Sequence, residues 1–329
     1  MDGFYCTIKC FSLRYYHVHK RVLYIISLFI LFTLPVRSQY DPSFSHYWSM
    51  EPSFNPASVG KESKINIVAA YALSLAGFEN NPRTMYAAAD MPFYFLKNYH
   101  GVGLSFMNDQ IGLFTHKKLG LQYAYKHRLV GGMFSLGVQI GMISEGFDGS
   151  GLDLGESSDP AFSTSSINGN SMDIGVGAYY LHKDWYAGFS VQHVNSPLVD
   201  MGETNELKID RTYYLTGGYN IKLRNPFLTI QPSVLGRTDG ITYRADVTGR
   251  LVYTNDKKIM YAGVAYSPTN SVTILIGGSF HGVNLGYSYE MYTSAINPGN
   301  GSHELIVSYQ TDLNLYKKGK NKHKSVRIL

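Results

Sequence analysis

Cysteine is nearly absent from this sequence, and so are apolar runs long enough to cross a bilayer. Of the 329 residues only Cys6 and Cys10 are cysteine, and both precede the first long apolar run. The rest of the chain therefore has no disulfide and no cysteine site, and this placement argues against a lipoprotein. After residue 38 no run approaches the ~20 apolar residues that a transmembrane helix needs.

The net charge of +5 is a poor sign of nucleic-acid binding. Residues 1–38 carry five bases and one acid, and the segment after Tyr316 carries six bases and no acid. The remaining chain has 18 basic and 23 acidic residues, so compositional support for nucleic-acid binding disappears. We expect the basic tail, residues 313–329, to be a solvated end or to contact anionic lipid or an acidic partner.

The first 38 residues have the pattern of an export signal. Lys20 and Arg21 precede an apolar run at residues 22–34, and small or modest side chains follow at residues 36–38. We expect cleavage after Ser38. A retained anchor helix is the alternative, although the run is shorter than the ~20 residues that span a bilayer.

Beyond this signal, apolar or aromatic residues alternate with glycine or polar residues in stretches of ~10, the length of a tilted membrane strand. Phe134 and Leu136 share one face of such a strand, while Ser135 and Gly137 share the other. The second face is too small and polar to line a packed core. Repeated over residues 64–312, the pattern predicts an all-β fold, an antiparallel transmembrane β-barrel of the outer-membrane type.

Turn residues divide this region into about fourteen strands, an even number as in bacterial barrels. The expected strands are residues 64–75, 83–94, 99–108, 117–129, 130–143, 171–182, 184–193, 211–222, 226–237, 241–253, 257–267, 271–280, 282–291 and 302–312. Both long connections, 144–170 and 194–210, follow odd-numbered strands. Because barrels have short periplasmic turns and longer external loops, we expect both ends of the chain in the periplasm. A β-sandwich or a soluble barrel would also alternate, but with fewer small-residue faces.

The two faces of the expected strands differ in kind. The outward face carries aromatic residues suited to a membrane interface, namely Tyr123, Tyr125, Tyr180, Trp185, Tyr243, Tyr253, Tyr287, Tyr289 and Tyr309. The inward face carries charges that we expect to form a lumen network, Arg244, Asp246, Arg250, Glu290 and Glu304. A pore constriction or a ligand site is the alternative role for these charges.

Motifs of the common enzyme classes are missing. The chain has no GxSxG elbow, HExxH helix, P-loop or reactive cysteine, and we predict no catalytic residue, no metal site and no cofactor. Two weaker hypotheses stay open. His193, Asp200 and Asp210 could assemble a hydrolase site at the barrel rim, and the acidic loop 148–159 offers oxygen ligands and turning glycines for Ca²⁺.

The beginning of the expected mature chain resembles a known signature. Residues 39–47 (QYDPSFSHY) and 55–60 (NPASVG) are similar to the QDPxFSxY and NPAxxG patterns of the PorP/SprF family, type IX secretion proteins of Bacteroidota. Tyr40 is an additional residue between Gln and Asp.

The end of the barrel region resembles the same family. Residues 286–290 (GYSYE) and 301–309 (GSHELIVSY) are similar to its GYSYD and GSHEI strand pair, with Glu290 in place of the commoner Asp. His303 and Glu304 belong to this signature. As neighbours on a strand they point to opposite faces, and we expect a structural role for them at the barrel seam.

The resemblance implies an outer-membrane barrel without enzymatic activity that works with the type IX secretion and gliding machinery. Such barrels capture secreted, often adhesin-like proteins bearing a type B C-terminal sorting domain and anchor them at the cell surface. Secretion components, possibly periplasmic ones, and outer-membrane lipid are the other expected partners. A passive channel for small solutes is the alternative, because about fourteen Gly-lined strands can enclose a pore.

Two segments are the candidates for partner contacts. Residues 39–63 are punctuated by proline and lack strand alternation, so they either plug the lumen or meet a periplasmic partner. The first long outer loop adds acidic and aromatic side chains. The candidate contact residues are Asp41, Pro42, Phe44, Tyr47, Asn55, Pro56, Asp148, Asp153, Asp159 and Phe162.

Overall fold

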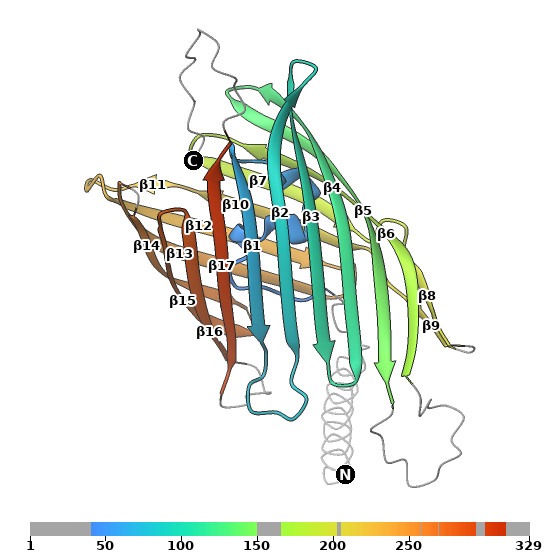
Figure 1. Ribbon diagram of the computed structural model, residues 1–329. Helices are drawn as coiled ribbons and strands as arrows, with labels where there is room; N and C mark the ends of the chain where they lie inside the picture. Colours follow the sequence, from blue (N-terminus) through green and yellow to red (C-terminus); the bar gives the residue numbers. More distant parts are fainter. Residues whose placement is uncertain are drawn as a thin grey trace, which may run out of the picture. The chain divides into compact units, whose positions relative to one another are not determined.

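The computed structural model describes residues 41–149, 166–202, 205–256, 258–268, 270–293 and 300–313. In these ranges fourteen antiparallel strands form one closed barrel (Figure 1). The barrel closes where its first strand pairs with its last, from the Lys64–Asp312 pair to the Leu73–His303 pair. The predicted fold class is therefore confirmed.

The wall strands are β1 (Lys64–Leu73), β2 (Arg83–Phe95), β3 (Asn98–Ile111), β4 (Phe114–Leu129), β5 (Gly132–Asp148), β6 (Ser166–Leu181), β7 (Trp185–Gln192), β10 (Thr212–Tyr219), β12 (Leu228–Thr238), β13 (Tyr243–Asn255), β14 (Lys258–Ser267), β15 (Ser271–Phe280), β16 (Val283–Tyr292) and β17 (Ser302–Asp312). The short strand β11 (Ile221–Lys222) pairs with β12. A separate hairpin of β8 (Leu198–Met201) and β9 (Asn205–Lys208) lies in the connection expected to be a loop. The wall strands follow the predicted ones in order, with β3, β4, β5 and β6 each three or four residues longer than predicted and β10 four residues shorter.

The barrel has two different ends. At the turn end, where β1 begins and β17 ends, tight connections join the strands. Leu96 and Lys97 have φ of 46° and 61°, and Val130 and Gly131 have φ of 46° and 78°. Positive φ at both central residues is the geometry of a two-residue type I′ hairpin turn. The opposite end, the loop end, carries the long connections after β5 and β7.

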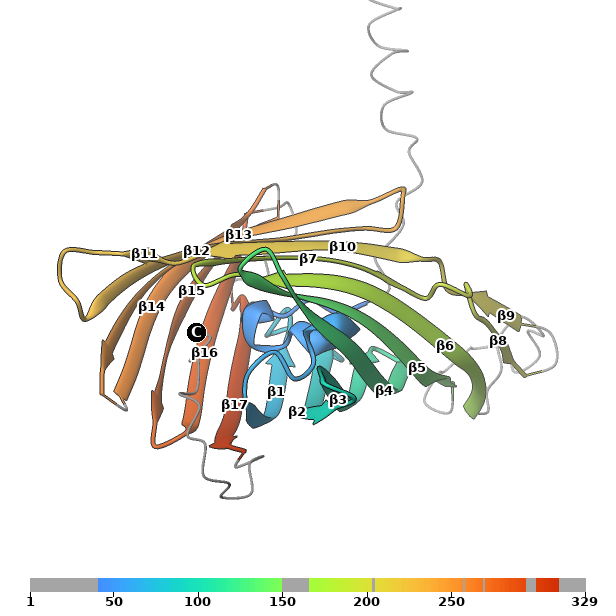
Figure 2. The same cartoon turned by 90° about the horizontal axis from the view of Figure 1, so that it is seen from above.

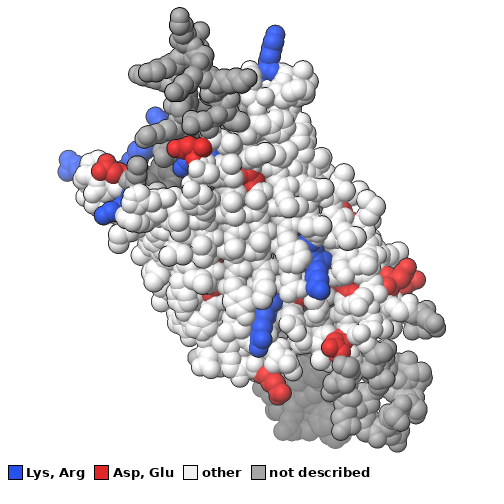
Figure 3. Space-filling view, viewed as in Figure 1, with Lys and Arg blue, Asp and Glu red and all other residues white. Residues whose placement is uncertain are grey.

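Side chains alternate between the two surfaces of the wall. On β5, Leu136 and Ile140 are 52% and 56% exposed on the outer surface, whereas Ser135 and Gln139 are buried on the inner one. Figure 3 shows an outer face with few charged side chains. Seven of the nine predicted outward aromatics are exposed by more than a third, namely Tyr123, Tyr125, Trp185, Tyr243, Tyr253, Tyr287 and Tyr309. An apolar outer surface around a polar interior is the pattern of a membrane barrel.

The buried core lies between the inner surface of the wall and residues 41–63, a segment that we call the plug. Figure 2 shows this segment inside the barrel. It forms three 3-10 turns, η1 (Tyr47–Ser49), η2 (Glu51–Ser53) and η3 (Pro56–Ser58). Phe44 and Met50 of the plug share one buried apolar cluster with wall residues of β1, β2, β3 and β17. No helix in the described ranges has the length and apolarity to cross a membrane.

Candidate functional site

The plug is irregular because its sequence favours turns over long helices or strands. Pro52 and Pro56 stand at the start of η2 and η3, where a missing N–H is no loss. The side-chain oxygen of Asn55 accepts a hydrogen bond from the Ala57 N–H at 3.0 Å and caps η3. Gly60, with φ of 61°, then turns the chain toward β1.

Glycines of the inner wall receive the turn-end half of the plug. A Cβ on Gly137 would lie 2.2 Å from the Ala57 nitrogen, and one on Gly177 would lie 2.1 Å from Asn55 Oδ1. A Cβ on Gly101 would lie 2.1 Å from the Val59 carbonyl oxygen. Gly101 and Gly137 therefore let the wall and plug backbones approach closely, and Gly177 leaves room for the Asn55 side chain. This role differs from the open polar lumen that their small size predicted.

The middle of the plug is held by one buried carboxylate. Glu304 of β17 accepts hydrogen bonds from the backbone N–H groups of Ser45 at 2.6 Å and His46 at 3.0 Å, and lies 2.6 Å from His46 Nδ1. On the other side of the plug, the Tyr47 hydroxyl lies 2.8 Å from Ser233 Oγ of β12. The plug is thus tied to opposite parts of the wall.

Two further cationic contacts fix the plug. Lys61 Nζ lies 2.5 Å from Oε2 of the fully buried Glu51, so an ion pair closes the plug on itself. The Arg250 guanidinium of β13 lies 3.9 Å from the centroid of the Trp48 ring. This is a cation–π contact between wall and plug.

At the loop end the plug begins in a cluster of polar wall groups. The Tyr214 hydroxyl of β10 donates to Asp41 Oδ2 at 2.6 Å, and His193 Nε2 lies 3.2 and 3.3 Å from the two carboxylate oxygens. Arg237 of β12 donates through one guanidinium nitrogen to the carbonyl oxygens of Asp41 at 2.7 Å and Pro42 at 3.2 Å. We call Tyr214, His193 and Arg237 the Asp41 receptor.

Charges behind the receptor keep Asp41 ionised. Asp173 Oδ1 lies 2.8 Å from His193 Nδ1, and Lys118 Nζ lies 3.1 Å from Asp173 Oδ2. Burial alone would raise the pKa of Asp41. The charge of His193, hydrogen bonds from His193 and Tyr214, and the charge of Lys118 outweigh burial and hold this pKa well below its usual range.

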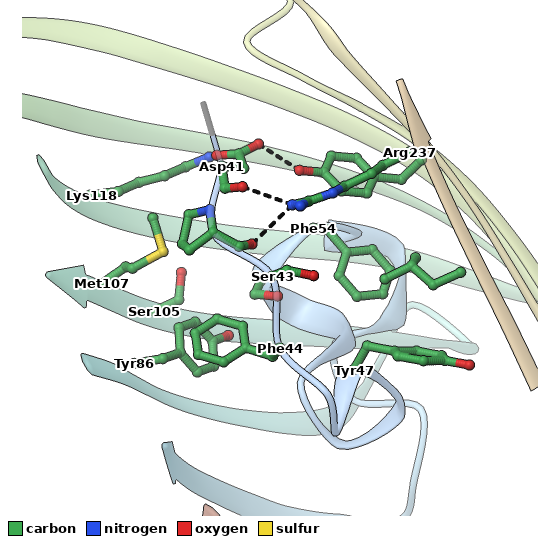
Figure 4. Close-up of a pocket in the computed structure, with 14 residues that line it drawn as sticks. Asp41, Ser43, Phe44, Tyr47, Phe54, Tyr86, Ser105, Met107, Lys118 and Arg237 are labelled. Carbon is green, nitrogen blue, oxygen red and sulfur yellow. Dashed lines mark hydrogen bonds between the residues drawn. The ribbon is translucent and has the colours of Figure 1, made fainter. Parts of the chain in front are cut away.

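A small cavity of about 30 Å³ adjoins the receptor (Figure 4). Its lining comes from the plug and from the wall: Asp41, Pro42, Ser43, Phe44, Tyr47, Ser53, Phe54, Tyr86, Ser105, Met107, Lys118, Tyr214, Leu235 and Arg237. Within the described part of the chain, the buried Tyr86 hydroxyl and Arg237 Nε have no hydrogen-bond partner. The plug therefore leaves part of the hydrogen-bonding capacity of this pocket unused.

The structure places the candidate contact residues in two groups. Those of the plug, Asp41, Pro42, Phe44, Tyr47, Asn55 and Pro56, lie inside the lumen and contact the wall or the plug itself. Asp148 is exposed at the end of β5. Asp153, Asp159 and Phe162 lie outside the described residues, as do the export signal, the tail after residue 313 and most of the acidic loop.

The five expected lumen charges divide into three sites. Arg244 lies 3.0 Å from Asp246 and 3.2 Å from Glu290, whereas Arg250 contacts Trp48 and Glu304 binds the plug. His303 faces the other way, as predicted from strand alternation. Its Nδ1 lies 2.7 Å from the Tyr287 hydroxyl.

The residues considered for a hydrolase have different partners. Both ring nitrogens of His193 face carboxylates, those of Asp41 and Asp173. Asp210 pairs with Lys208 at 3.3 Å, and Asp200 is exposed on β8. In the described ranges no group of three or more His, Cys, Asp or Glu side chains is placed to hold a metal ion.

Sequence reasoning missed the Asp41 receptor. Strand alternation does put Tyr214 and Arg237 on the inward face, and it places Lys118 and Asp173 there as well. No local signal, however, says which of the many inward polar residues the plug meets, because the partners are separated by more than a hundred residues.

Several solved structures are similar to this chain. The "CymD monoaromatic hydrocarbon channel" is 10% identical, with 80% of this chain and 93% of that chain covered and a TM-score of 0.49. The Pseudomonas putida toluene transporter TodX is 10% identical over 84% and 95%, with a TM-score of 0.47. A Pseudomonas aeruginosa FadL homologue is 11% identical over 77% and 89%, with a TM-score of 0.44.

Comparison with curated protein sequences finds no match. The sequence model of one family, described as "Type IX secretion system membrane protein PorP/SprF", matches residues 36–309. The match includes the plug and the wall up to β17, and so both signatures identified in the sequence. The chain belongs to the PorP/SprF family of type IX secretion system membrane proteins.

Proposed function

We propose that this protein captures secreted proteins with a type B C-terminal sorting domain and anchors them at the cell surface. Membership of the PorP/SprF family supports a role in type IX secretion, and the barrel fold supports an outer-membrane location. Surface adhesins are the clients we expect, with gliding as a process that depends on them.

The observation that carries this proposal is the occupied lumen. The plug bonds to β17 through His46, to β12 through Tyr47, to β6 through Asn55 and to β2 through Gly60. A segment tied to four parts of the wall, with glycines shaped to its backbone, suits an anchor better than an open pore. This favours anchoring over the passive-channel alternative.

We further propose that the turn end faces the periplasm, because short turns do so in bacterial barrels. Asp312 then lies on the periplasmic side, and the basic tail would meet periplasmic or lipid partners. Asp41, by contrast, lies at the loop end. Under this proposal the start of the plug is external and Asp312 is periplasmic, unlike the expectation that both ends of the chain are periplasmic. The plug runs from the loop end to the turn end.

The client would meet the loop end. Asp148 is exposed there, and the β8–β9 hairpin rests on the wall through Val199, which packs in one cluster with Ile143. Leu198 and Leu207 of the hairpin are 54% and 37% exposed. These residues form the proposed client surface, and Asp153, Asp159 and Phe162, outside the described residues, remain candidate contacts from the sequence between β5 and β6.

Deletion of the gene in the native host tests the proposal. We expect type B proteins to be lost from the cell surface, measured by surface proteolysis and mass spectrometry, and restored by the wild-type gene. An affinity-tagged copy should co-purify with a secreted type B protein. Normal display of every type B protein in the deletion strain, together with steady conductance of the purified barrel in planar bilayers, would overturn the anchor in favour of a channel.

A further inference from the structure

The Asp41 receptor is built to recognise a short acidic segment. Three wall elements, β10, β12 and the residue after β7, converge on one aspartate and on two successive backbone carbonyl groups. Three residues further on, the Phe44 ring packs 5.7 Å from the Tyr86 ring, centroid to centroid. The wall therefore contacts a carboxylate, two backbone carbonyl groups and an aromatic side chain of the plug.

The plug does not fill this receptor completely. The cavity beside Phe44 is lined by residues that include Tyr86 and Arg237, and the buried Tyr86 hydroxyl and Arg237 Nε have no hydrogen-bond partner among the described residues. Figure 4 shows Tyr86 beside Phe44, with Arg237 directed at the first residues of the plug. Buried polar groups normally find partners, so a ligand that supplies two further acceptors would bind here more completely than the plug does.

The first residues of the plug are also the part that can leave. Residues 55–60 are enclosed by the glycines of β3, β5 and β6, where no side chain could intervene. Residues 41–44 instead are held mainly by side chains of the receptor and by the packing of Phe44. Exchange of this stretch requires no movement of the turn-end half.

We propose that the Asp41 receptor is a binding site for a carboxylate-bearing peptide segment of the anchored client, and that residues 41–44 occupy it until the client displaces them. The identity of the ligand as a client segment rests on the proposed anchoring function. The chemistry of the site, an acidic residue followed by an aromatic one, rests on the receptor and on the contact of Phe44 with Tyr86. Client capture would thereby loosen the loop-end half of the plug.

A peptide that copies residues 41–44 tests the site on the purified, detergent-solubilised protein. The probe is fluorescein-Gly-Gly-Asp-Pro-Ser-Phe-amide, with a second peptide carrying Asn in place of Asp, and binding is measured by fluorescence anisotropy. In Asp41→Asn protein, which lacks the competing carboxylate, we expect the acidic peptide to bind at least about tenfold more tightly than the Asn peptide, because hydrogen bonds to a charged acceptor are the stronger ones. Wild-type protein should bind the acidic peptide more weakly than this variant.

Matched variants separate recognition from misfolding. Tyr214→Phe removes one receptor hydroxyl and should weaken binding of the acidic peptide, whereas Tyr213→Phe alters the neighbouring residue on the outer surface and should not. Glu62→Gln, which changes another carboxylate of the plug outside the receptor, is a second control and should leave binding of the acidic peptide unchanged. Equal binding of the two peptides, or no binding to wild-type and Asp41→Asn proteins that retain the heat-modifiable mobility of a folded barrel, would overturn the receptor.

The two proposals fail separately. If the acidic peptide binds as expected but deletion of the gene leaves every type B protein displayed, the receptor stands and the anchoring role falls. If deletion abolishes display but neither peptide binds, the receptor falls alone.

Discussion

Replacement of Glu304 by alanine should release the plug from the wall. The carboxylate accepts two backbone N–H groups and faces His46 Nδ1, and it is only 5% exposed. A hydrogen bond to a charged group contributes about 1.5–3 kcal/mol. Because the three contacts share one carboxylate and are not additive, we expect a loss of about 3–6 kcal/mol of docking free energy.

This loss is large enough to measure as accessibility. At about 1.4 kcal/mol per tenfold change, the fraction of molecules with a released plug should rise on the order of 10²–10⁴-fold. A Ser58→Cys reporter at a position of the plug that is 1% exposed, with Cys6 and Cys10 replaced, is the single thiol of the chain. Its rate of labelling by a membrane-impermeant maleimide then reports the release.

His303→Ala is the matched control for Glu304→Ala. The two residues are neighbours on β17, but His303 contacts Tyr287 on the outer surface and not the plug. We expect its labelling rate to stay near that of the parent protein. A labelling rate for Glu304→Ala within about threefold of the control would refute the idea that Glu304 holds the plug, provided that heat-modifiable mobility shows a folded barrel. The threefold limit lies well below the change expected from the hydrogen-bond energies.

Three other perturbations test the remaining contacts. Gly137→Val should displace the plug, because even a Cβ at this position would lie 2.2 Å from the plug backbone, and should raise single-channel conductance in planar bilayers. Gly249→Ala is the control and should leave the conductance unchanged, because a Cβ there has no neighbour within 4 Å. Lys61→Met leaves the buried Glu51 carboxylate unpaired and should destabilise the protein by about 3–5 kcal/mol, seen as a lower midpoint of thermal unfolding; an unchanged midpoint would contradict a stabilising ion pair. Because the folded-state pKa of Asp41 is lowered, its stabilisation is complete above its unfolded pKa and is lost as pH falls through the folded value. The midpoint of thermal unfolding should therefore fall as pH drops below about 4, and the fall should be smaller in Asp41→Asn protein, which lacks this contribution at every pH.

The wall of the barrel was predictable because each strand carries its own signal. A period of two in burial requires a period of two in sequence, and turn residues mark where it breaks. The same geometry predicted that the side chains of His303 and Glu304 lie on opposite surfaces of the wall. The β8–β9 hairpin was not predicted because four-residue strands are too short to show the alternating pattern, although Val199 and Met201 do alternate with exposed residues.

The interior was predictable only in part. Proline and the absence of alternation showed that residues 41–63 do not form a wall strand, and a plug was one of two placements that this allowed. The partners of the plug could not be read, since Glu304 and His46 lie 258 positions apart and many inward polar residues are equivalent in sequence. Similarly, we expected the five inward charges to pair with one another, whereas Glu304 and Arg250 contact the plug instead.

The position of the plug also bears on how the barrel is assembled. The plug leads directly into β1, which pairs with β17 to close the wall, and Glu304 of β17 binds Ser45 and His46, the two residues immediately before the η1 turn. The first-made part of the chain can thus serve as a template on which the last-made strand is aligned. A barrel that closed before its N-terminal segment was in place would have to admit that segment afterwards and then fit it against Gly101, Gly137 and Gly177, where the docked segment leaves no room for a side chain. Closure of the wall around the segment avoids this later insertion.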